Sequence, residues 1–182
     1  GMYAKAIDIF RKGIVVDPDD SGMHYFLGIV FMNAGELDSA IKEFKYTLVL
    51  SPDHAGAFYS LGNAYCDKNM LDAALTSYGE AVRINGNYVD AYNNIGSILY
   101  KKGMFDDAID AWKMAIKINP NFVDAYYNLG NAYDEKGMFH ESVSVWRKAL
   151  EINPDMLDAR YNLGVVYTEN EMHREAIHEF KQ

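Results

Sequence analysis

The fold is decided by residues 123–156, which read VDAYYNLGNAYDEKGMFHESVSVWRKALEINPDM. The same pattern recurs along the chain at an interval of 34 residues, and its most constant element is a leucine or isoleucine followed by glycine. The five pairs are Leu27-Gly28, Leu61-Gly62, Ile95-Gly96, Leu129-Gly130 and Leu163-Gly164. A fixed period of this size indicates an array of one supersecondary unit rather than a domain built around a single central core.

Within a repeat, the apolar residues are spaced as on one face of a helix. Tyr126, Leu129 and Tyr133 are three and four residues apart, and the segment that follows shows the same spacing. In four copies the two segments are separated by a residue that tolerates a left-handed backbone: Gly35, Asn69, Gly103 or Gly137. The fifth copy has Glu171 there, so we expect its turn to be strained or differently built.

Two further columns of the repeat predict helix starts and helix packing. A proline or glycine closes each repeat, and the next residue predicts an N-cap. These N-cap candidates are Asp19, Asp53, Asn87, Asn121 and Asp155. Because Gly130 has no side chain, we expect the second helix to approach it closely at Ser142, and Trp146 to pack between one helix pair and the next.

This pattern resembles that of the tetratricopeptide repeat (TPR) family. One copy matches it at Tyr126, Leu129, Gly130, Tyr133, Ser142, Trp146, Ala149 and Pro154. The resemblance covers nearly the whole chain. It implies an all-α fold, a right-handed α-solenoid (superhelix) of antiparallel helix pairs, with eleven helices here.

The repeat boundaries predict one solenoid domain with partial repeats at both ends. Residues 1–20 form the second helix of a partial repeat, and a last partial repeat spans 157–182. The complete repeats are 21–54, 55–88, 89–122 and 123–156. Both terminal helices carry apolar residues that a neighbouring repeat would cover. We therefore expect end-to-end self-association or a longer parent array, with frayed ends of a trimmed chain as the alternative.

Composition excludes several classes of function. The net charge of -9 argues against nucleic acid and anionic membranes, and favours a neutral or basic protein partner. No segment predicts membrane insertion or a signal peptide, so we expect a cytoplasmic protein. His173 and His178 are five residues apart, off a common helical face, which argues against a metal pair. No catalytic grouping or cofactor motif occurs, so we expect no enzyme activity and no cofactor.

In the TPR family the first helix of each pair lines a concave surface, and the resemblance assigns asparagine and tyrosine columns to it here. An asparagine side chain can donate and accept hydrogen bonds at once, which suits an extended peptide backbone. The candidate peptide-binding residues are Asn63, Asn94, Asn128, Asn131 and Asn162, flanked by Tyr59, Asn93, Tyr127 and Tyr161. The ladder Asn94, Asn128, Asn162 resembles that of glycosyltransferase-associated TPR arrays. The alternative is that the asparagines stay hydrated and the tyrosines pack between helices.

The functional hypothesis is a non-catalytic interaction module that binds an extended protein segment in its concave groove. An apolar groove patch of Phe26, Ile29 and Met32 would receive a hydrophobic anchor or pack against a preceding repeat. Acidic residues near the groove, among them Asp134 and Glu135, would steer a basic segment. The alternatives are a substrate-recruiting region of a larger enzyme, for example a glycosyltransferase, and a scaffold that assembles end to end.

Overall fold

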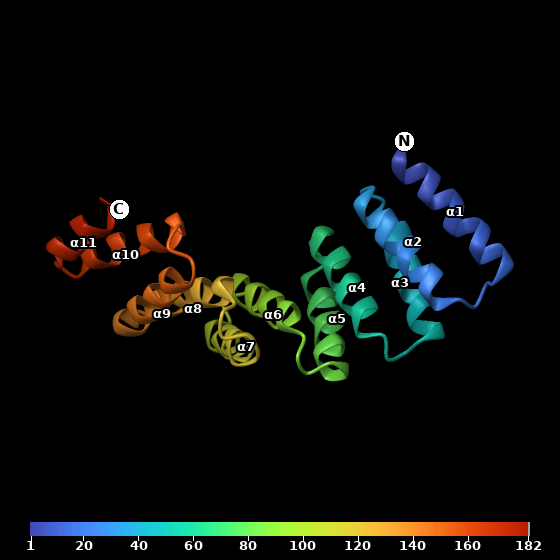
Figure 1. Ribbon diagram of the computed structural model, residues 1–182. Helices are drawn as coiled ribbons and strands as arrows, with labels where there is room; N and C mark the ends of the chain where they lie inside the picture. Colours follow the sequence, from blue (N-terminus) through green and yellow to red (C-terminus); the bar gives the residue numbers. More distant parts are fainter. Residues whose placement is uncertain (182) are drawn as a thin grey trace. The chain divides into compact units, whose positions relative to one another are not determined.

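The computed structural model describes residues 1–181, and within them the chain forms eleven α-helices and no strand (Figure 1). In chain order they are α1 (Met2–Val16), α2 (Ser21–Asn33), α3 (Leu37–Leu50), α4 (Ala55–Asp67), α5 (Leu71–Ile84), α6 (Val89–Lys101), α7 (Phe105–Ile118), α8 (Val123–Glu135), α9 (Phe139–Ile152), α10 (Leu157–Glu169) and α11 (His173–Glu179). Short turns join them, and α2 with α3, α4 with α5, α8 with α9 and α10 with α11 make extensive contacts. The predicted all-α class is therefore confirmed.

The turn inside each helix pair depends on one residue with a positive φ angle. Asn69 has a φ of 56° and Glu171 one of 60°, beside three glycines between 67° and 77°. In the last turn the amide of Met172 donates to the carbonyl of Tyr167 at 2.8 Å, as the equivalent residues do in the other turns. Glu171 thus builds the same turn as the glycines. The expected strain is present, because a left-handed backbone costs a residue with a Cβ about 1–2 kcal/mol.

The turns between pairs are one residue longer than predicted, so the N-cap predictions are wrong. The carboxylate of Asp20, not Asp19, accepts the Met23 amide at 3.0 Å at the start of α2. Nδ1 of His54, not Asp53, accepts the Ala57 amide at 3.0 Å at the start of α4.

In the later turns the predicted N-cap residues do not cap a helix; their backbone N–H groups donate hydrogen bonds to an asparagine side chain two residues earlier. The side-chain oxygens of Asn85, Asn119 and Asn153 accept the backbone N–H groups of Asn87, Asn121 and Asp155, at 3.1–3.2 Å. This is the local Asx turn in which an asparagine bonds to the backbone two residues on. Asn87, Asn121 and Asp155 therefore lie inside the turn, and each helix starts two residues after them.

The glycine column makes room for an aromatic ring of the same helix pair. A Cβ atom on Gly130 would lie 2.3 Å from Nε1 of Trp146, a side chain that is only 1% exposed. The same close contact between a glycine and an aromatic ring recurs at Gly28 with Phe44, Gly62 with Tyr78, Gly96 with Trp112 and Gly164 with Phe180. Ser142 is fully buried on α9, and its hydroxyl donates to the carbonyl of Phe139 at 2.9 Å; a close approach of the two helices at Ser142 itself stays a prediction.

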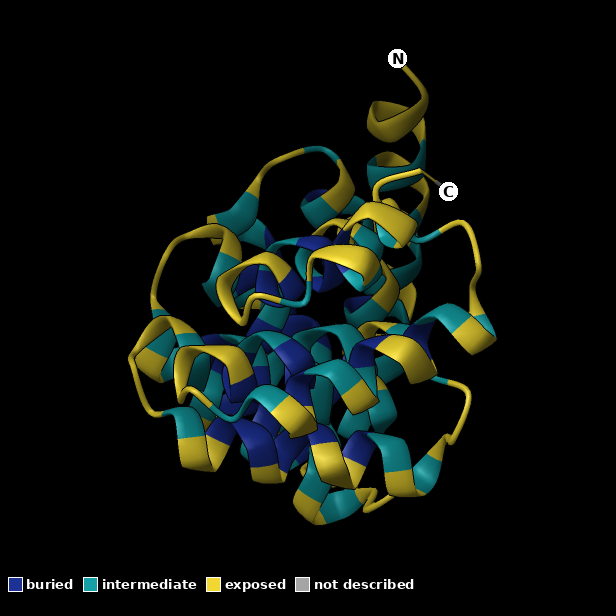
Figure 2. Ribbon diagram, turned by 90° about the vertical axis from the view of Figure 1, so that its left-hand side faces the viewer, coloured by how far each residue is buried: buried dark blue, intermediate teal, exposed yellow. Residues whose placement is uncertain are grey.

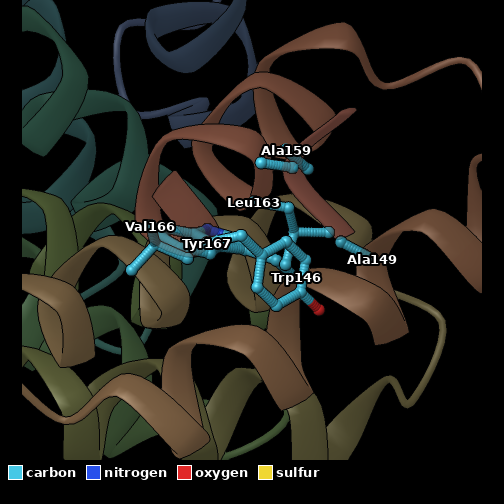
Figure 3. Close-up of a cluster of buried hydrophobic side chains, with 7 residues drawn as sticks. Trp146, Ala149, Ala159, Leu163, Val166 and Tyr167 are labelled. Atoms are coloured by element: carbon cyan, nitrogen blue, oxygen red, sulfur yellow. The ribbon is translucent and has the colours of Figure 1, made fainter. Parts of the chain in front are cut away.

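The same tryptophan also joins its helix pair to the next one. Trp146 packs in one cluster with Ala159, Leu163, Val166 and Tyr167 of α10 (Figure 3). This confirms that Trp146 lies between successive pairs. Along the chain, buried positions lie on the sides of helices that face other helices, and exposed positions gather on the turns and outer sides (Figure 2).

Packing contacts divide the chain into two compact units, Gly1–Ala91 and Tyr92–Gln182. The first has a core around Leu27, Phe31 and Phe44 that side chains of α1 help to cover. The second contains the cluster around Trp146.

Candidate peptide-binding site

In the second unit, asparagines on the first helices of successive pairs bond to one another. Nδ2 of Asn128 on α8 donates to Oδ1 of Asn93 on α6 at 3.1 Å. Nδ2 of Asn162 on α10 donates to Oδ1 of Asn131 on α8 at 2.9 Å. Four predicted residues are thus brought together as two bridges. Each bridge uses one N–H group and one acceptor, so the pair keeps further hydrogen-bonding capacity.

Two adjoining hollows open beside these bridges. The first, of 240 Å³, is lined by Ser97, Tyr100, Lys101, Trp112, Asn128 and Asn131. The second, of 270 Å³, is lined by Tyr100, Asn131, Asp134, Glu135, Tyr161, Asn162 and Val165. Tyr100 and Asn131 line both hollows. We call the two hollows together the Asn groove.

Charge is concentrated at the second hollow. The Tyr100 hydroxyl donates to Oε1 of Glu135 at 3.3 Å. Burial raises the pKa of Tyr100, and the charge of Glu135 raises it further. Burial also raises the pKa of Asp134, with the neighbouring charges of Glu169 and Glu135 adding to the shift. This end of the groove therefore holds carboxylates that repel one another.

The two predicted tyrosines of this unit differ in role. Tyr127 is half-buried against the cluster around Trp146, and its carbonyl accepts the indole N–H at 3.1 Å. Tyr161 lines the second hollow and is 63% exposed. Tyr127 therefore supports the helix pair, whereas Tyr161 is available to a ligand.

In the first unit, the predicted site residues take part in internal packing. Oδ1 of Asn63 accepts the Tyr78 hydroxyl at 2.6 Å. The ring of Tyr59 stacks on Tyr88, with 4.7 Å between the centroids. Burial raises the pKa of Tyr88 to about 12, with smaller contributions from nearby charges.

The predicted apolar patch is mostly part of the core of the first unit. Ile29 and Met32 are half-buried against the cluster around Leu27. Phe26 is 54% exposed, and its ring stacks on Phe10 of α1 at 6.3 Å. Of the three, Phe26 is the one that presents a large surface to solvent.

Asn94 is half-buried and has an interaction of its own. It lies next to Asn93, the residue that bridges to Asn128. The column of Asn94, Asn128 and Asn162 as a ligand-binding ladder stays a prediction; the two bridges link Asn93 with Asn128 and Asn131 with Asn162.

Sequence reasoning missed Tyr100, which lines both hollows. A step of 34 residues places Cys66, Tyr100, Asp134 and Thr168 in one column. These side chains share neither size nor charge, so the column gave no repeating signal. Its position could have indicated it, because this column lies one helical turn beyond the column of Asn63, Ser97 and Asn131.

The described residues form neither a candidate metal-binding group nor a helix able to span a membrane. Within residues 1–181, no group of three His, Cys, Asp or Glu side chains could hold a metal ion. Over the same residues, every helix falls short of the length and apolar character needed to cross a bilayer.

Comparison with known families and structures identifies the repeat. Family models described as TPR repeat or tetratricopeptide repeat match residues 1–55, 62–103, 96–137 and 123–156. The chain belongs to the tetratricopeptide repeat family. No curated protein sequence matches it.

Solved structures of TPR proteins are similar over most of the chain. MamA is 34% identical, with 84% of this chain and 89% of MamA covered and a TM-score of 0.80. YrrB is 26% identical, with 94% and 89% covered and a TM-score of 0.81. The C-terminal part of a TPR protein from Cytophaga hutchinsonii, 22% identical, shares the fold, with 93% and 67% covered and a TM-score of 0.82. These similarities confirm the predicted TPR-like solenoid class; the likeness to glycosyltransferase-associated arrays stays a prediction.

Proposed function

We propose that the chain is a non-catalytic interaction module that binds an extended segment of a partner protein in the Asn groove. The observation that carries this proposal is the pair of adjoining hollows lined by Asn128, Asn131 and Asn162. YrrB, which is similar in fold, is described as a TPR protein with an unusual peptide-binding site.

An extended backbone suits this groove because it presents N–H and C=O groups in alternation, about 3.3 Å per residue. Asparagine amides can pair with either group. Contacts of this kind bind main chain, so they give affinity with little dependence on the ligand's side chains. Exposed Tyr161 adds rigid apolar contact area with a polar tip, as binding surfaces favour.

The partner segment would be neutral to basic. The net charge of the chain is -9, and Asp134 and Glu135 line the groove. Complementary charge of this kind raises the association rate more than the affinity.

A display library of unstructured peptides tests this function. Selection is made on the wild type, and the selected peptides are then titrated against Asn128→Ala/Asn131→Ala/Asn162→Ala. The matched control is Asn33→Ala/Asn87→Ala/Asn121→Ala, three exposed asparagines outside the groove. We expect binding at least about tenfold weaker in the groove variant and unchanged in the control. Equal binding to both variants, with helicity intact, would exclude the groove.

End-to-end self-association is a second candidate because α1 presents apolar side chains to solvent. Val15 is 82% exposed and Val16 is 86% exposed. Light scattering over a range of concentrations tests it, with Val16→Asp as the variant that should lower any associated mass. A constant monomeric mass for the wild type would exclude this candidate.

A further inference from the structure

The second hollow of the Asn groove differs from the first in the charge that it presents, and this difference suggests what it binds. Its lining carries the carboxylates of Asp134 and Glu135 and no basic side chain. We call it the acidic hollow. The first hollow is lined by Lys101 instead.

Neighbouring basic residues form their ion pairs elsewhere. Lys136 follows Glu135 in the sequence but pairs with Asp106. Arg160 precedes Tyr161 but pairs with Glu179 at 3.6 Å. The lining of the acidic hollow is therefore anionic without a lysine or arginine of its own.

The backbone adds to this negative potential. Asp134 and Glu135 are the last two residues of α8. The C-terminal end of a helix carries a partial negative charge from its unpaired carbonyl groups and favours cations. Carboxylates at this position are unfavourable for the helix, so stability of the fold does not explain them. Charged residues that are unfavourable for the stability of the fold are expected at binding sites.

The other lining groups suit a long cationic side chain. The rings of Tyr100 and Tyr161 provide aromatic surface for the stem and for the cation itself. The carboxylates can accept charge-assisted hydrogen bonds from a planar guanidinium. The volume of 270 Å³ lies below the roughly 300–1,000 Å³ of small-molecule sites, so one side chain is a better fit than a separate ligand.

We propose that the acidic hollow binds an arginine side chain of the extended segment, with its guanidinium against Asp134 and Glu135. This inference rests on the proposed function and adds a specificity position to it. Lys101 in the first hollow disfavours a second basic residue there. The two hollows together would therefore set the register of the segment.

The test uses the full chain and two synthetic probes, Ac-Ala-Ala-Arg-Ala-Ala-NH2 and the same peptide with neutral, isosteric citrulline in place of arginine. Binding is followed by NMR through the side-chain amide signals of Asn131 and Asn162, which line the hollow. One anchored side chain should give a Kd of about 1–10 mM. We expect the arginine peptide to bind at least about tenfold more tightly than the citrulline peptide.

Two variants separate the acidic hollow from the overall negative charge. Asp134→Asn/Glu135→Gln should remove the preference for arginine over citrulline. Asp110→Asn/Glu141→Gln removes two exposed carboxylates of α7 and α9 that do not line the hollow, and should keep that preference. Equal binding of the two probes, no shift at the highest peptide concentration, or a preference that survives the first variant would overturn the inference.

Failure of the arginine inference can be distinguished from failure of the proposed peptide binding. Library peptides that need the groove asparagines but share no basic position would leave peptide binding standing and exclude the arginine hollow. A selection without any peptide that depends on the groove asparagines would remove the proposed function itself.

Discussion

Replacement of Gly130 by alanine tests the packing that places α8 against α9. The added Cβ would lie 2.3 Å from Nε1, 2.5 Å from Cδ1 and 2.7 Å from Cε2 of Trp146. The ring cannot swing into solvent, since it is 1% exposed and packed in a cluster with α10. Its N–H also donates to the carbonyl of Tyr127 at 3.1 Å.

The expected magnitude follows from three contributions. Overpacking of a filled core costs about 1–3 kcal/mol. A lost or stretched indole hydrogen bond costs about 1 kcal/mol more. Alanine in place of glycine inside a helix contributes about 0.5–1 kcal/mol in the opposite direction. We therefore expect Gly130→Ala to lower the free energy of unfolding by about 1–3 kcal/mol.

Gly79→Ala is the matched control because Gly79 also lies inside a helix, α5, but no atom comes within 4 Å of an added Cβ. This variant should be stabilised by about 0.5–1 kcal/mol. Guanidinium denaturation followed by circular dichroism measures both. Repeat arrays can unfold in parts, so tryptophan fluorescence in a Trp112→Phe background, with Trp146 as the single tryptophan, reports on the α8–α9 pair. Gly130→Ala at least as stable as wild type would refute the packing argument.

Three further predictions concern strain and ionisation. Glu171→Gly should raise stability by about 1 kcal/mol by relieving the left-handed backbone, measured by denaturation; an unchanged midpoint would contradict the strain. The raised pKa of Asp134 means that its ionised form opposes folding above the folded-state pKa. Asp134→Asn should therefore raise the free energy of unfolding at pH 7 and not at pH 3. A gain of equal size at both pH values would contradict this. Tyr88 has its pKa raised to about 12, so its contribution to stability is full below about 10 and is lost as pH rises through 12. Ultraviolet titration should show that Tyr88→Phe removes a phenol ionising near 12; loss of one ionising near 10 would contradict the burial.

The period of the sequence was sufficient to predict the helix pairs, and it placed on their first helices the four asparagines that bond to one another in the second unit. It could not tell which asparagines bond to which, because the offset between successive helices depends on packing. Asn63 and Asn131 occupy the same column of the repeat, but their side chains have different hydrogen-bond partners. Tyr78 brings a hydroxyl that donates to Asn63, whereas Trp146 donates to the backbone and leaves the Asn131 side chain to Asn162.

The N-caps and the acidic hollow show the same limit. An Asp or Asn after proline is a good capping residue, but the side-chain oxygen of Asn119 accepts the Asn121 amide first and shifts the helix start by one residue. Tyr100 and Asp134 share a column without sharing chemistry, so their meeting with Tyr161 in one hollow follows only from the positions of three helices.

In the proposed complex the guest segment lies along α6, α8 and α10. NMR shift changes on addition of a library-selected peptide would map its position. We predict that the largest changes fall on the side-chain amides of Asn128, Asn131 and Asn162. Changes confined to another surface, such as the 370 Å³ hollow beside His24 and Tyr46 in the first unit, would contradict it.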